Sequence, residues 1–204
     1  MANNETMRPA LMASENVQSL LVSVKYQITT TAGEGASAVT TSEFADIHDG
    51  ALVVLGDLAA NDPYNVGTRN GDTINGYKDD NVYLAKAPAA TTDDVVIVDL
   101  AEITQGSIAG NVYKMGIKLY GLVAEAGMPA RARRLWKGDK FWLQSDCFTA
   151  APTVGEYAIP TANDTHHTPS KTKAASGYCV KIQDARPFVT GNTVRDKLYL
   201  CEVV

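Results

Sequence analysis

Residues 21–28 read LVSVKYQI, and this stretch decides the fold class. Val22, Val24, Tyr26 and Ile28 alternate with mostly polar neighbours, a spacing that predicts a half-buried β-strand. Further strands are expected at 51–58, 82–87, 95–100, 112–119, 122–124, 130–135, 141–143, 157–159, 177–182 and 197–203. Frequent turn signals separate them, among them Asp49-Gly50, Asn70-Gly71 and Asn75-Gly76. The sequence therefore predicts an all-β fold, mainly antiparallel, with sandwich-like or barrel-like parts and little helix.

The segments between the expected strands are predicted to be irregular. Loops are expected at Thr29–Ser42, Asn61–Asn81 and Pro160–Ser176, and a turn at Gly106–Asn111. Weak helical spacing occurs at Ala10–Leu20 and Leu100–Thr104. The first 19 residues form either a short helix or an extended arm that grips a neighbouring molecule.

Charge divides the chain into two unequal parts. Residues 1–127 hold 7 Lys and Arg against 16 Asp and Glu, whereas residues 128–204 hold 11 against 7. We therefore expect an N-terminal arm (1–19), an acidic β-rich domain with long loops (20–127) and a C-terminal barrel-like or sandwich-like domain (128–204). This polarity suits head-to-tail contact between copies or docking onto a charged surface. The basic excess is too small to favour duplex nucleic acid as a partner.

The composition is that of a globular protein that builds its own core. Hydrophobic residues make up 45% of the 204 positions and charged residues 20%. The apolar runs are too short to cross a bilayer, and residues 1–12 do not resemble a secretory signal, so we expect cytoplasmic synthesis and no membrane partner. Cys147, Cys179 and Cys201 form an odd set without a CxxC pair, which favours buried free thiols over a disulfide.

The residues that commonly bind metals do not form a recognisable motif. His166 and His167 are adjacent, so on an extended strand they would point to opposite faces, and we expect a solvated loop pair. His48, beside a turn, receives the same interpretation. The segment Asn70–Asn81 resembles an oxygen-rich calcium loop only superficially, because the motif's alternating ligands and terminal Glu are missing. No cofactor, no metal site and no catalytic residue are predicted, and the chain is not expected to be an enzyme.

The densest basic cluster is the best candidate for a partner-binding site. Arg131 and Arg133 alternate along one expected strand and should share a face, with Arg134 beside them. Guanidinium groups pair well with carboxylates and phosphates. Solvated strand positions are the alternative interpretation. If the cluster binds a partner, Arg131→Glu with Arg133→Glu is expected to weaken that binding and leave the fold intact, because exposed strand charges rarely carry stability. The proposed partner-binding residues are Arg131, Arg133, Arg134, Trp136 and Arg8.

Aromatic residues surround the basic cluster. Trp136, Phe141 and Trp142 are expected to pack in the core, although aromatic side chains are also enriched at interfaces. If exposed, Trp136, Trp142 and Tyr157 would instead form a platform for a sugar.

The last third of the chain resembles small β-rich structural proteins of tailed bacteriophages. The resemblance covers residues 128–204 and rests on the layout of KGDKFWL (137–143), PTVGEYAIP (152–160), SGYCVKI (176–182) and KLYLCEV (197–203). The most similar group is the capsid decoration, or cement, proteins.

The resemblance implies a role and partners. Such a protein binds the outside of an icosahedral head, contacts the major capsid protein and bridges capsomers, often as a trimer. The chain would then reside in the virion, after synthesis in the host bacterial cytoplasm. Alternatives are a tail-tube, tail-fibre or baseplate component, a carbohydrate-binding β-module and, last, a hydrolase that uses a histidine.

Overall fold

The computed structural model describes residues 6–13, 20–32, 39–60, 78–100, 105–108, 111–114, 122–190 and 193–204. The described chain is almost entirely β-structure, as the alternating sequence pattern predicts. A short 3-10 helix, η4 (Ser145–Cys147), interrupts it, and no α-helix of seven or more residues occurs among the described residues. The all-β prediction is therefore confirmed.

Sixteen strands are described. They are β1 (Met7–Leu11), β2 (Leu21–Ala32), β3 (Val39–Phe44), β4 (Ile47–His48), β5 (Leu52–Ala60), β6 (Lys78–Lys86), β7 (Val96–Val98), β8 (Gln105–Ile108), β9 (Asn111–Lys114), β10 (Val123–Ala124), β11 (Ala130–Arg134), β12 (Lys140–Gln144), β13 (Tyr157–Pro160), β14 (His167–Ser170), β15 (Val180–Thr190) and β16 (Thr193–Val203). Two large sheets contain twelve of them, and the pairs β4–β10 and β8–β9 form small sheets of their own.

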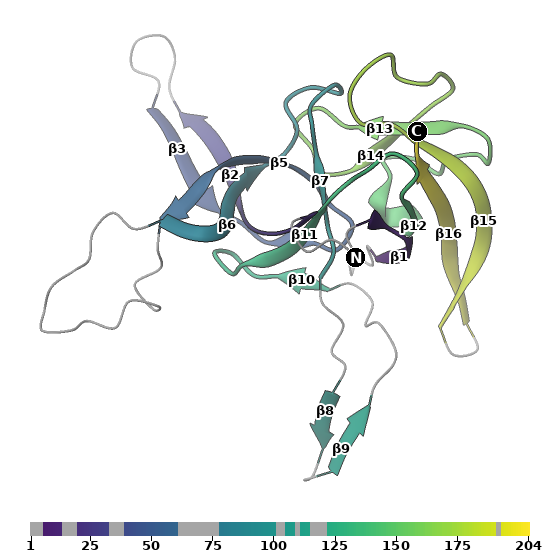
Figure 1. Ribbon diagram of the computed structural model, residues 1–204, viewed down its shortest axis with the longest axis horizontal. Coiled ribbons are helices and arrows are strands. Elements are labelled where there is room, and N and C mark those ends of the chain that lie inside the picture. Colours follow the sequence, from purple (N-terminus) through teal and green to yellow (C-terminus); the bar gives the residue numbers. More distant parts are fainter. Residues whose placement is uncertain are drawn as a thin grey trace, which may run out of the picture.

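The first large sheet closes on itself as a small barrel (Figure 1). Its strand order is β11-β7-β5-β6-β2, and β11 also pairs with β2, which completes the ring. Strands β2 and β6 are parallel, and the other neighbours in the ring are antiparallel. Strand β3 adds to β2 as a hairpin partner outside the ring. Closure satisfies the backbone hydrogen bonds that an open sheet would leave at its edges.

The barrel interior is filled by small apolar side chains. Val24, Val53, Val98, Ala130 and Ala132 belong to this core and are at most 1% exposed. Valine and alanine suit the position because the inside of a five-stranded ring is narrow.

The second large sheet packs against the outside of the barrel. Its order is β1-β12-β16-β15-β13-β14, with antiparallel neighbours throughout. Leu52 and Ile97 point outward from the barrel and meet Phe141, Ile182 and Cys201 of this sheet in a second core. Strand β7 and the start of β5 are thus buried on both faces, which explains their continuous apolar sequence.

The two sheets do not follow the division that charge suggests at residues 127 and 128. Strand β1 precedes that line but pairs with β12, whereas β11 follows it but closes the barrel against β2. Met7 and Met12 are 0% and 2% exposed in the second core. Residues 7–11 are therefore a strand of the chain's own sheet and not part of a helix over Ala10–Leu20.

Several expected loops contain strands. Thr29–Ser42 was predicted to be a loop, but β2 continues to Ala32 and β3 begins at Val39. Threonine's branched Cβ favours extended backbone, and this preference outweighs the loop-like composition. Strand β14 lies inside the expected loop Pro160–Ser176, and β8 and β9 extend into both ends of the expected turn at Gly106–Asn111. Positions 101–104 of the helical candidate Leu100–Thr104 and the turn-rich positions 61–77 lie outside the described residues.

Candidate partner-binding surfaces

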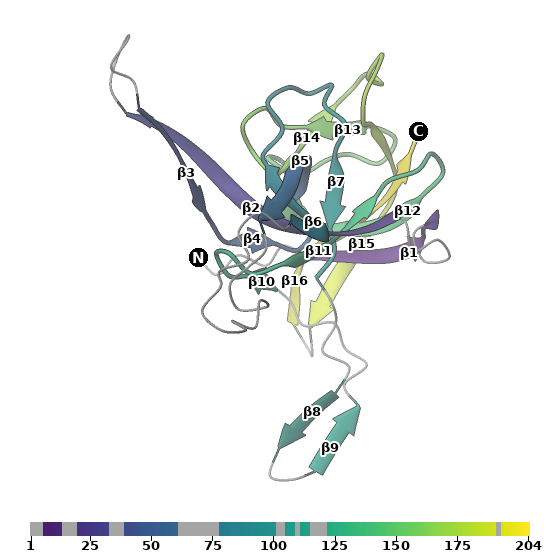
Figure 2. The ribbon, with the colours of Figure 1, turned by 60° about the vertical axis from the view of Figure 1, so that its left-hand side comes forward.

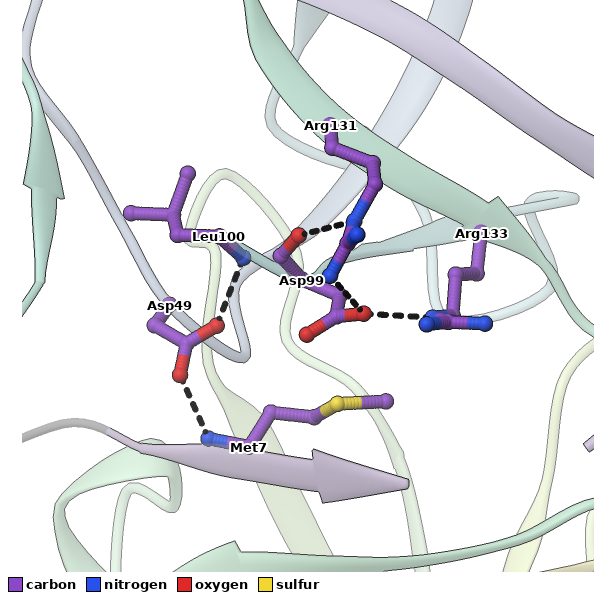
Figure 3. Close-up of polar contacts among 6 residues, drawn as sticks. All are labelled: Met7, Asp49, Asp99, Leu100, Arg131 and Arg133. Atoms are coloured by element: carbon purple, nitrogen blue, oxygen red, sulfur yellow. Dashed lines mark hydrogen bonds and ion pairs between the residues drawn. The ribbon is translucent and has the colours of Figure 1, made fainter. Parts of the chain in front are cut away.

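Arg131 and Arg133 project from the same face of β11 and converge on one buried carboxylate (Figure 3). Asp99 Oδ2 accepts hydrogen bonds from Arg131 Nη2 at 2.8 Å and from Arg133 Nε at 2.5 Å. Arg131 Nε also donates to the main-chain oxygen of Asp99 at 2.9 Å. The side chain of Asp99 is 1% exposed, that of Arg133 8% and that of Arg131 38%. The predicted shared face is confirmed, and much of its charge is directed at the protein itself.

This geometry corrects the expectation that the two arginines are solvated. Arg133 neutralises a carboxylate that has almost no contact with water, and a buried carboxylate is strongly destabilising without its cation. Arg131→Glu with Arg133→Glu would place two further carboxylates against Asp99. We therefore expect this double substitution to disrupt the fold, contrary to the expectation from sequence.

Two more buried carboxylates hold the N-terminal strand in place. Asp49 Oδ2 accepts a hydrogen bond from Met7 N and its Oδ1 one from Leu100 N, both at 2.9 Å (Figure 3). Asp139 Oδ1 accepts one from Ala13 N at 2.8 Å. Hydrogen bonds to an ionised carboxylate are stronger than those to a neutral acceptor. Both ends of the segment 7–13 are thus fixed to the body by carboxylates more than 40 residues away in sequence.

The turn that contains Asp49 also requires a glycine. Gly50 has φ +85, and a Cβ there would lie 2.9 Å from Cys147 Sγ and 3.3 Å from Leu143 Cδ2. Glycine is needed for both the backbone conformation and the close approach. The Asp49-Gly50 turn signal therefore marks the point where the barrel contacts the second sheet.

Arg134 and Trp136 lie apart from the Asp99 pair. Arg134 is on the opposite face of β11, at one end of the barrel, where its guanidinium carbon lies 6.0 Å from the centre of the Tyr83 ring. It lines an open cleft of about 370 Å³ together with Val54, Leu55, Tyr83, Asp93, Asp94 and Val96. Trp136 is 64% exposed and therefore does not pack in the core as expected.

The turn that presents Trp136 is well ordered by hydrogen bonds. Trp136 N donates to Asp139 Oδ2 at 2.8 Å, and Asp139 N donates to the main-chain oxygen of Trp136 at 3.0 Å. Leu11, also 64% exposed, lies opposite Lys140 on the neighbouring strand, directly after this turn. We call Trp136, Lys137 and Leu11 the Trp136 corner.

Arg8 belongs to a different surface, which sequence reasoning missed. Arg8, Trp142 and Leu200 lie side by side on β1, β12 and β16, on the sheet face that points away from the barrel. Arg186 of β15 places its guanidinium carbon 3.9 Å from the centre of the Trp142 ring, a cation–π contact. We call this row, with Arg186, the Trp142 face. Its residues are distant in sequence, so no local pattern reveals it.

The three aromatic residues considered for a sugar platform do not meet. Trp142 is half-buried beneath Arg186 on β12, whereas Tyr157 lies on β13. Strands β16 and β15 separate them, which corresponds to about 14 Å at the usual strand spacing. The geometry therefore does not favour one continuous platform.

His167 is a core residue rather than half of a solvated pair. It is 0% exposed; its Nδ1 lies 3.2 Å from the Cys147 carbonyl oxygen and its Nε2 2.9 Å from the Tyr178 hydroxyl. The carbonyl can only accept, so Nδ1 carries the proton and Nε2 accepts from the tyrosine. Burial lowers the pKa of His167 to about 3. As expected, His166 faces elsewhere, and it contacts Asp164 Oδ1 at 2.5 Å.

The cysteines and the other candidate ligands have structural surroundings. Cys147, Cys179 and Cys201 are buried free thiols, as predicted, and burial raises the pKa of Cys201. Within the described ranges, no group of three or more His, Cys, Asp or Glu could hold a metal ion. Most of the calcium-like segment, positions 70–77, lies outside those ranges. In the same part of the chain, no helix is long and apolar enough to cross a membrane.

The chain has no match among protein-family models, curated proteins or solved structures.

Proposed function

We propose that this chain is a structural protein of a phage virion that binds the outer surface of the capsid and bridges capsomers. One observation carries the proposal furthest. Two buried carboxylates join distant segments: Asp99 joins β11 to the end of β7, and Asp49 joins β1 to the barrel. Such cross-links would suit a protein that resists force. The layout shared with decoration proteins at residues 128–204 supports the same role.

The Trp136 corner is the surface that we propose contacts the capsid shell. An exposed tryptophan beside a lysine on a hydrogen-bonded turn combines the aromatic anchor and low conformational freedom found at interface hot spots. Repeated over a lattice, even weak contacts of this kind give strong net attachment. The major capsid protein of the same virus is the proposed partner.

Quantitative mass spectrometry of gradient-purified particles of the encoding virus tests the location. A copy number in fixed ratio to the major shell protein would support the decoration role. A copy number that matches a tail ring or fibre would instead assign the protein to the tail. Absence of the protein from particles would overturn the proposal.

A pair of substitutions tests the assigned surface. Trp136→Ala should lower the occupancy of the protein on purified heads by about tenfold or more, because an aromatic hot spot contributes about 2 kcal/mol or more of binding free energy. Val154→Ala is the matched control, since Val154 is 51% exposed at another turn. Circular dichroism of both variants checks the fold. Equal occupancy of the two variants would show that the Trp136 corner does not contact the shell.

A further inference from the structure

An acidic, partly apolar patch lies at the base of the β2–β3 hairpin. Phe44 is 45% exposed and Met128 60% exposed. The turn Glu125–Met128 packs against Phe44, because a Cβ on Gly127 would lie 3.8 Å from the phenylalanine ring. Ala126 N donates to Asp46 Oδ1 at 2.9 Å, which fixes the turn in this position. The turn that carries Met128 is thus fixed beside Phe44.

Carboxylates surround these apolar side chains. Asp46 follows Phe44, and Glu125 begins the turn that ends at Met128; both are exposed. Glu43, next to Phe44 on β3, projects from the opposite face of the strand. We call Phe44, Met128, Asp46 and Glu125 the Phe44 patch. A hydrophobic centre with a charged rim is the usual anatomy of a protein interface.

The Trp142 face has the complementary character. Trp142 and Leu200 provide its apolar centre. Of the charged residues on this side of the sheet, four are cationic and three acidic: Arg8, Lys140, Lys181 and Arg186 against Asp184, Asp196 and Glu202. Arg186 is exposed on the tryptophan ring. The excess of positive charge matches the negative rim of the Phe44 patch.

The two surfaces lie on opposite sides of the molecule. The second sheet packs on β5 and β7, whereas β2 and its partner β3 lie across the ring from that contact. The Trp142 face points away from the barrel, beyond the second core. In Figure 2, β3, β4 and β10 accordingly appear on one side and β1 and β12 on the other. A surface and its complement on opposite sides cannot meet within one molecule.

We infer that the Phe44 patch of one copy docks on the Trp142 face of a second copy, in a head-to-tail contact. This inference goes beyond the proposed function, and it needs no shell. A heterologous contact uses two different surfaces and leaves one of each available, so it generates rings or open chains. Complementary charge selects the partner surface and accelerates the encounter.

Charge-swapped variants of the purified full chain test the contact by analytical ultracentrifugation. Arg186→Glu makes the Trp142 face acidic. Glu125→Lys with Ala126→Lys makes the Phe44 patch basic and keeps the main-chain hydrogen bond from Ala126 to Asp46. Each variant alone should associate about a hundredfold more weakly than wild type, because like charges would then face one another. Mixed together, the two variants should associate again, because the unchanged Phe44 patch of the first fits the unchanged Trp142 face of the second, and their two charge-swapped surfaces complement each other. Lys171→Glu and Asp57→Lys, both exposed and elsewhere, are the matched controls.

Salt provides a second readout. Raising the salt concentration from about 0.1 M to about 1 M shortens the Debye length from about 10 Å to about 3 Å and should weaken wild-type association. A wild type that stays monomeric, variants that associate as wild type does, or a mixture without a complex would each overturn the inference. Shell occupancy is measured on particles, so the proposed function can stand or fall separately.

Discussion

Asp99 is contacted by two arginines that differ in exposure, and this difference predicts unequal effects of their removal. Arg133→Ala should lower the free energy of unfolding by about 3 kcal/mol, because it takes a buried cation from a buried carboxylate. Arg131→Ala should cost about 1 kcal/mol, since the Arg131 side chain is 38% exposed and water partly replaces it. Urea unfolding followed by tryptophan fluorescence measures both values.

Arg134→Ala is the control for these two variants. Arg134 lies on the same strand but at the open cleft, so its removal should change stability by less than about 0.5 kcal/mol. Equal losses from Arg133→Ala and Arg134→Ala would contradict the role assigned to the Asp99 contact.

His167 should make the protein sensitive to acid. The folded state keeps this imidazole neutral down to a pKa of about 3, whereas the ordinary pKa is 6.5. At a pH between these two values, unfolding therefore takes up a proton at His167. The contribution of the neutral His167 side chain to the free energy of unfolding is complete above pH 6.5 and is lost progressively as the pH falls below 6.5. The slope should approach about 1.4 kcal/mol per pH unit.

His167→Gln isolates this effect from the titration of the carboxylates. Glutamine is neutral at every pH. The difference in free energy of unfolding between wild type and variant should therefore be constant above about pH 7 and shrink below about pH 6. Urea titrations at a series of pH values measure this difference. Parallel curves across the range would mean that His167 is not held neutral in the folded protein.

At the scale of elements, β1 is expected to behave as a core strand rather than as a detachable arm. Met7→Ala should cost about 2–5 kcal/mol, because Met7 is fully buried in the second core. Leu11→Ala, on the same strand but 64% exposed, should be nearly neutral. Thermal unfolding followed by circular dichroism compares the two.

A deletion gives a stricter version of this test. Removal of residues 1–13 should destabilise the protein by about 4 kcal/mol or more, since two buried methionines alone contribute about 2 kcal/mol each. A synthetic peptide of residues 5–13 should restore stability by adding to the edge of β12. A truncated protein as stable as the full chain would show that the docked strand is dispensable.

Strands were predictable where alternation was local, and their partners were not. The pattern LVSVKYQI identifies β2, and KLYLCEV identifies β16, whose Tyr199 and Cys201 enter the second core. Thr29–Ser42 was misread because threonine and serine are common in both loops and exposed strands. The order of strands around the barrel depends on contacts between distant residues, which periodicity does not encode.

The candidate site shows the same limit. The sequence identified Arg131 and Arg133 as a pair on one face, but their partner Asp99 lies more than 30 residues earlier in an apolar strand region. His167 looked solvated because its neighbours are polar, and its burial depends on Phe148 and Tyr178 from other segments. The Trp142 face required the register of three strands, which only the folded chain provides.

At the scale of the whole molecule, the shared second core predicts one cooperative unfolding transition. Leu52 and Ile97 from the first part of the chain pack there with Phe141 and Ile182 from the second part. Strands β1 and β11 each pair across the division in charge. Neither part can complete its core or its hydrogen-bonded sheet alone, which is the condition for all-or-none behaviour.

Separate fragments should therefore fail to fold. Residues 1–127 would lack β11, which closes the barrel, and residues 128–204 would lack β1 and the outward side chains of β5 and β7. We expect each fragment alone to show an unfolded far-ultraviolet circular dichroism spectrum. In the intact chain, the urea transition by circular dichroism should coincide with that of Trp136 and Trp142 fluorescence, because both tryptophans lie on the second part. Two separated transitions, or a folded fragment, would instead establish two independent domains joined at residues 127 and 128.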